Sequence, residues 1–96
     1  MSEREGWHHR PIRIVADRPH LTAREREVII LAGCGLTARG TGLALHITTN
    51  TVKVHRARAL LALHATDMAN ALALAIVQNV ITREELAEAL EKRRVA

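Results

Sequence analysis

Thr51-Val52-Lys53-Val54-His55 is the stretch that decides the fold of this 96-residue chain. It follows a helix-start signal at residues 48–49 and lies downstream of a second helix-start stretch, Leu21-Thr22-Ala23-Arg24-Glu25. Apolar and polar residues after both signals recur at the spacing of amphipathic helices. The sequence therefore predicts a helix with a polar, basic outer face and an earlier helix that supports it.

Composition favours a small all-α fold. The chain is 48% hydrophobic but contains a single Trp and no Phe or Tyr, so its core must be built from Leu, Ile, Val and Ala. Ala and Leu favour helices. A chain of this length holds one small domain with short extensions, and its core alone is marginal. The formal net charge of +4 suits an anionic partner.

No catalytic or metal-binding pattern is found. Cys34 is the only cysteine and lies between two glycines. His46, His55 and His64 are spaced nine apart, which does not bring them to one helical face as metal ligands. The sequence also lacks paired carboxylates, a serine elbow and a phosphate-binding glycine loop. We expect that the protein is not an enzyme and that it binds no metal and no cofactor.

The chain has no targeting or membrane signal. Residues 1–6 lack the apolar stretch of a signal peptide, and no run approaches the roughly 18 apolar residues of a membrane span. With no disulfide to form, the chain suits a reducing compartment. We expect a cytoplasmic protein without a membrane partner.

Start and stop signals divide the chain into five predicted helices. A capping box, Thr22-Ala23-Arg24-Glu25, opens the first helix, and a second one, Thr82-Arg83-Glu84-Glu85, opens the last. Asn79 is expected to end the fourth helix, because Asn tolerates the left-handed backbone conformation that often follows a helix. The predicted helices span residues 23–32, 38–45, 49–64, 68–78 and 83–94. The corresponding domains are an N-terminal arm at 1–20, a helical domain at 21–81 and a C-terminal extension helix at 82–96.

The second and third predicted helices, joined by the tight turn His46-Ile47-Thr48, form a helix-turn-helix pattern. From Leu21 to Ile81 the chain resembles, without a gap, the DNA-binding domain of LuxR-type transcription regulators, whose pattern is roughly LTxRExEVLxLxAxGxSNKEIAxxLxISxxTVKxH. The matching residues are Leu21, Thr22, Arg24, Glu25, Glu27, Val28, Gly35, Leu45, Ile47, Thr51, Val52, Lys53 and His55, with Thr37 and Thr48 in place of Ser and Arg39 in place of Lys.

The resemblance implies a compact four-helix domain that binds a two-fold DNA site as a homodimer, with the helix at 49–64 in the major groove. To that domain this chain adds the C-terminal amphipathic helix. The resemblance also implies dimerisation through the fourth helix, whose apolar stripe is Met68, Leu72, Ala75 and Ile76. Most family members carry a receiver or ligand-binding domain upstream, so we expect a stand-alone member.

The resemblance places Lys53 and Val54 against bases, and their chemistry agrees: Lys53 donates to guanine, and the Val54 methyls meet a thymine methyl. Polar groups near the helix N-terminus suit phosphate oxygens. For His55 two alternatives remain, a contact with the DNA backbone or packing within the domain. The candidate DNA-binding set is Thr48, Thr49, Asn50, Thr51, Lys53, Val54, His55, Arg56, Arg58 and Arg39.

Departures from the family pattern concentrate in the predicted helix at 38–45, the first helix of the helix-turn-helix, which we call the bracing helix. Gly40-Thr41-Gly42 stands where the family has Glu-Ile-Ala, which removes a core Ile and adds two glycines that weaken a helix by about 1 kcal/mol each. Ala57 offers no hydrogen bond to a base. We therefore expect a loose bracing helix and modest affinity or sequence specificity.

Two functions follow as hypotheses. The first is a DNA-binding transcription regulator, and the alternative is an adaptor whose helix-turn-helix scaffold binds RNA polymerase or another regulator. The arm, with Arg4, Arg10 and Arg13 around Trp7, either enters a minor groove or is a tail. The last helix, with Leu86 and Leu90 one turn apart, either covers the core or extends a dimer interface.

Overall fold

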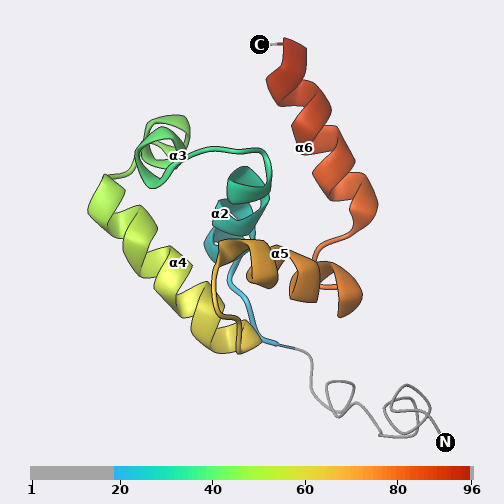
Figure 1. The fold of residues 1–96 in the computed structure, drawn as a ribbon. Helices are drawn as coiled ribbons and strands as arrows, with labels where there is room; N and C mark the ends of the chain where they lie inside the picture. Colours follow the sequence, from blue (N-terminus) through green and yellow to red (C-terminus); the bar gives the residue numbers. More distant parts are fainter. Residues whose placement is uncertain (1–18, 96) are drawn as a thin grey trace, which may run out of the picture.

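The computed structural model describes residues 19–95, with side chains as far as residue 93. This part of the chain is all-helical, as predicted (Figure 1). The five helices are α2 (Ala23–Gly33), α3 (Ala38–Leu45), α4 (Thr49–Leu63), α5 (Met68–Val77) and α6 (Arg83–Val95). The predicted arm lies almost wholly outside the described residues.

Local side-chain chemistry sets the helix boundaries. In α2 the capping box is reciprocal: the Thr22 hydroxyl accepts from the Glu25 amide at 3.1 Å, and the Glu25 carboxylate accepts from the Thr22 amide at 3.1 Å. Asn79 has a φ of 57°, which confirms the predicted left-handed stop. The capping threonines and Asn79 therefore explain why the observed boundaries fall within a residue or so of the predicted ones. The other N-caps are Thr37, Thr48 and Asp67.

The second capping box is only half formed. The Thr82 hydroxyl accepts from the Glu85 amide at 3.1 Å, but the Glu85 carboxylate forms an ion pair with Arg26 of α2. Arg26 also donates through Nε to the Val80 carbonyl at 3.2 Å. One arginine thus fastens both the α5–α6 connection and the start of α6 to α2, so α6 is anchored at its N-terminal end.

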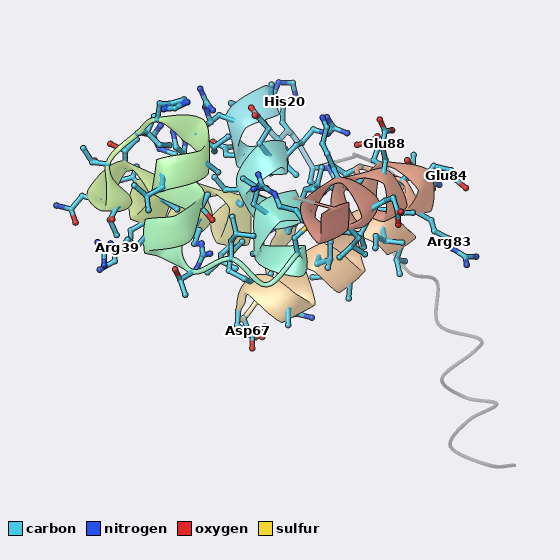
Figure 2. All side chains as sticks on the ribbon, turned by 90° about the horizontal axis from the view of Figure 1, so that it is seen from above. His20, Arg39, Asp67, Arg83, Glu84 and Glu88 are labelled. Atoms are coloured by element: carbon cyan, nitrogen blue, oxygen red, sulfur yellow. The ribbon has the colours of Figure 1, made fainter. Side chains whose placement is uncertain are left out.

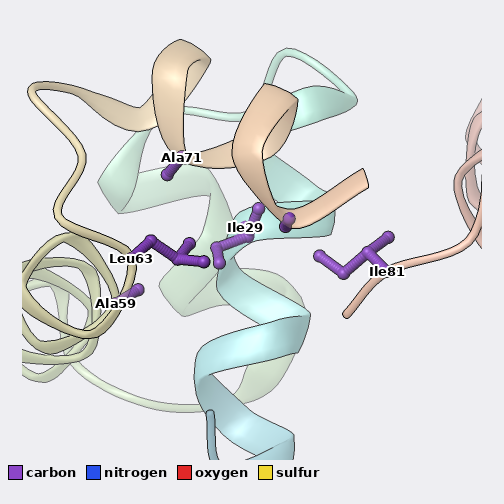
Figure 3. Close-up of a cluster of buried hydrophobic side chains, with 6 residues drawn as sticks. Ile29, Ala59, Leu63, Ala71 and Ile81 are labelled. Carbon is purple, nitrogen blue, oxygen red and sulfur yellow. The ribbon is translucent and has the colours of Figure 1, made fainter. Parts of the chain in front are cut away.

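Helix α2 lies at the centre of the domain and packs against α3, α4, α5 and α6. Figure 3 shows Ile29 of α2 between Leu63 of α4 and Ile81, with small alanines on the facing helices. Alanine lets two helix backbones approach closely, so three helices converge on one aliphatic cluster without any aromatic side chain. The fully assembled cluster is Ile29, Ala59, Leu63, Ala71, Ala75 and Ile81.

No single described helix has both the length and the apolarity of a membrane span. Only α4 and α5 taken together pass that test, by length and composition alone, and they are bent by 49° at their junction.

Candidate nucleic-acid interface

The turn between α3 and α4 folds directly onto Gly42. The Gly42 carbonyl accepts from the amides of His46 and Ile47, the second at 3.0 Å, while His46 takes a left-handed φ of 59°. A Cβ added at Gly42 would lie 2.6 Å from the Ile47 carbonyl oxygen. Gly42 therefore permits a close approach of backbone to helix, a role that the sequence pattern did not indicate.

Gly40 has no such role. A Cβ added there would lie 3.4 Å from the Thr37 hydroxyl oxygen, an ordinary van der Waals distance. The Thr37 hydroxyl caps α3 by accepting from the Gly40 amide at 3.0 Å. The two glycines of the bracing helix thus differ, because only Gly42 is required by its surroundings.

Thr41 occupies the family's core isoleucine position and is fully buried. Within the described residues its hydroxyl has no hydrogen-bond partner. An unsatisfied buried hydroxyl costs about 1–3 kcal/mol. This cost sits in the bracing helix, where the sequence predicted weakness.

Helix α4 begins with a double threonine cap. The Thr48 hydroxyl accepts from the Thr51 amide at 3.1 Å, and the two hydroxyl oxygens are 2.8 Å apart. Of the two hydroxyls expected to suit phosphate, those of Thr48 and Thr49, the Thr48 hydroxyl is therefore already engaged in the cap. Thr49 and Asn50 follow in the first turn, half-buried and exposed respectively. A helix N-terminus with unpaired amides attracts phosphate.

The outer face of α4 presents the central candidates to solvent. Lys53, Ala57 and Arg58 are exposed, and the Val54 side chain is 48% exposed despite being apolar. Together with Asn50 these residues form what we call the reading face: Asn50, Lys53, Val54, Ala57 and Arg58. It combines one amide, two cations and two methyl-bearing side chains, the groups that contact base edges and phosphates.

Arg56 and His55 do not belong to this face. The Arg56 guanidinium donates to the Leu36 carbonyl at 3.0 Å, and its Nε is buried without an acceptor among the described residues. His55 buries Nδ1, also without a partner there. The structure thus turns Arg56 toward the α2–α3 connection, whereas the sequence placed it among the DNA contacts.

A signal in the sequence could have found this. Val52, Ala59 and Leu63 form the buried stripe of α4, and Arg56 falls on the same stripe at spacings of four and three. A basic residue on a buried stripe more often serves the fold than a ligand.

Arg39 of α3 is exposed and lies at one end of the molecule, while Arg83, Glu84 and Glu88 of α6 lie at the other end (Figure 2). The two glutamates therefore stand apart from the α3–α4 side. This separation keeps Glu84 and Glu88 away from the α3–α4 side.

The predicted dimerisation stripe is largely internal. Ala75 is fully buried in the core, so it has no surface to offer a partner, and Leu72 packs beside Gly33 of α2. Met68 and Ile76 are half-buried. We name the exposed side of this helix the α5 face: Ala69, Ala73 and Val77, all exposed at a spacing of four.

A helix-turn-helix whose second helix presents Asn, Lys and Arg to solvent defines a DNA-binding regulatory domain. Residues 19–75 match the family described as bacterial regulatory proteins, luxR family, and the chain belongs to that family. This confirms the resemblance drawn from the sequence.

The chain is also similar to the transcriptional activator protein BjaR1 of Bradyrhizobium diazoefficiens, at 46% identity over 61 residues. The match covers 64% of this chain and 25% of that protein, so the chain spans a minor part of its relative's length. The search of solved structures found no match.

Proposed function

We propose that this chain is a DNA-binding transcription regulator that binds a two-fold site as a homodimer, with α4 in the major groove. The observation that carries the proposal is the reading face, exposed on α4 and held by α3 through the tight turn on Gly42. Membership of the luxR family and similarity to a transcriptional activator support it. Such a role belongs in the cytoplasm and needs no cofactor.

Within this proposal the residues on and around the reading face make different contacts with DNA. Lys53 donates to guanine oxygen or nitrogen acceptors, and Val54 meets a thymine methyl. Thr49, Asn50 and the α4 N-terminus hold one phosphate, while Arg58 and Arg39 bind phosphates on either side. Arg56 positions α4 from inside.

The α5 face supplies the homodimer contact in the same proposal. Its two alanines and Val77, which is 68% exposed, form a small apolar surface that a second copy would cover. A two-fold pair of α4 helices then reads half-sites about 34–36 Å apart, which is one turn of DNA.

Selection of bound sequences from random DNA, followed by footprinting, tests the function directly. We expect an enriched site with two-fold symmetry. Lys53→Ala should weaken binding to that site by about 1–3 kcal/mol and relax the preference at one base pair. The matched control is Arg83→Ala, which removes an exposed cation from α6 and should leave affinity unchanged. Unchanged affinity in Lys53→Ala would refute the proposal.

A second candidate function is an adaptor for RNA polymerase or another regulator. It is favoured by two exposed leucines on the helix-turn-helix, Leu43 at 70% and Leu61 at 77%. Titration of the protein against purified RNA polymerase, without DNA, separates the candidates. Binding that is lost in Leu43→Ala, together with no enriched DNA site, would support the adaptor.

A further inference from the structure

A groove opens between α6 and the α2–α3 side of the domain. Its volume is about 370 Å³, and its floor is aliphatic, formed by Ile30, Leu31, Leu45 and Ala89. None of these residues belongs to the reading face or the α5 face. An aliphatic groove of this kind is a surface that a further apolar element would cover.

Helix α6 is only partly covered by its own chain. It packs mainly against α2, where Leu86 lies beside Gly33. Leu90, one turn later, is 44% exposed. Figure 1 shows α6 continuing past the other helices toward the C-terminus. Because short isolated helices are marginal in water, the C-terminal half of α6 gains stability from any element that packs on it.

The groove carries charge in a directional order. Its α6 wall has Glu88 in the N-terminal half and Lys92 and Arg93 in the C-terminal half, and Glu27 of α2, which also pairs with Arg24, adds a further acid. Glu85 lies on the same wall, but its carboxylate is already paired with Arg26. A second α6 lying antiparallel sets its basic end against these acids and its acidic end against these bases. A parallel arrangement would place like charges opposite each other.

We infer that α6 of a second copy of this chain lies antiparallel along the groove, and that a two-fold axis repeats the same contact in the other copy. Such an axis relates identical surfaces, and the charge order of the α6 residues that line the groove is complementary to itself only in that arrangement. The contact buries Leu90 of each copy over the partner's aliphatic floor. This inference deepens the homodimer of the proposed function by adding a contact separate from the α5 face, and it does not depend on DNA binding.

Charge reversal tests the contact and its direction. Every chain carries Val77→Asp, so that the α5 face contributes no association, and no DNA is present. One variant adds Glu27→Lys and Glu88→Lys, and the other adds Lys92→Glu and Arg93→Glu. Sedimentation equilibrium gives the dissociation constant, and circular dichroism confirms that each variant is folded.

We expect the Val77→Asp chain to dimerise, and each charge-reversed variant to dissociate at least tenfold more readily. An equal mixture of the two variants should regain dimers that contain one of each, since opposite charges then face each other again. A monomeric Val77→Asp chain, unchanged association of the reversed variants, or a mixture that stays monomeric would each overturn the inference.

A second pair of variants tests the apolar part of the contact in the same background. Leu90→Lys should weaken association at least tenfold, whereas the matched control Leu61→Lys, on α4, should not. If Val77→Asp alone abolishes association of the unsubstituted chain, the inference is wrong while the α5 homodimer stands. If association through α6 persists but no DNA site is enriched, the proposed function fails and the inference survives.

Discussion

The guanidinium of Arg56 donates to the main-chain oxygen of Leu36 at 3.0 Å, and this bond ties helix α4 to the connection between α2 and α3. Arg58, two residues later, is exposed. Two arginines of similar sequence context thus serve different ends, since one positions the reading face and the other belongs to it.

Replacement of each arginine by alanine should separate these roles. Arg56→Ala removes a hydrogen bond from a charged donor and should lower the free energy of unfolding by about 1–3 kcal/mol. Arg58→Ala should change stability by less than about 0.5 kcal/mol but reduce the salt dependence of DNA binding by about one phosphate contact. Urea unfolding and DNA titration at several salt concentrations provide the two measurements. Equal stability of the two variants would contradict the assignment.

The two glycines of α3 should respond in opposite ways to alanine. Gly42→Ala sets a methyl group against the Ile47 carbonyl and should destabilise the domain by about 1–3 kcal/mol, because backbone must move. Gly40→Ala meets only ordinary contacts and should stabilise it by about 0.5–1 kcal/mol through helix propensity. Thermal unfolding of both variants is the check, and a stabilising Gly42→Ala would show that the turn is not held by close approach.

Thr41→Val should stabilise the protein. Valine has nearly the same shape but removes the buried hydroxyl, which has no partner among the described residues, so we expect a gain of about 1–2 kcal/mol. For a domain of this size that corresponds to a rise in Tm of about 4–16 °C. The same substitution at Thr37 removes the α3 cap and should instead cost about 1 kcal/mol. A loss of stability in Thr41→Val would mean that the hydroxyl has a partner in solution.

Val77→Asp should weaken the proposed α5 contact without unfolding the chain. Val77 is exposed, so the charge stays in water in the monomer but would be buried against a second copy. We expect at least a tenfold weaker α5 contact, measured by sedimentation in the Leu90→Lys background, which removes the α6 contact.

Ala75→Leu, inside the core, should destabilise the monomer by about 1–3 kcal/mol. If Ala75→Leu dissociated the homodimer without lowering the stability of the monomer, Ala75 would belong to the interface.

Features that depend on near neighbours were predictable from sequence. Thr22, Thr48 and Asn79 set helix boundaries through hydrogen bonds or backbone preferences that span only a few residues, so their residue types indicate where helices begin and end. The family resemblance was equally visible in the sequence, and the match of residues 19–75 to the luxR family confirms it.

Only the tertiary structure decided the features that join distant segments. The Glu85 carboxylate belongs to a local capping box by sequence, yet Arg26 takes it, because the start of α6 packs on α2. Arg56 has the charge of a phosphate-binding residue, but its guanidinium donates to the Leu36 carbonyl. Ala75 lies on the predicted dimerisation stripe, but it is fully buried in the core. In each case the sequence specifies which groups are available, while the packing of α2 against its neighbours determines which of them still face solvent.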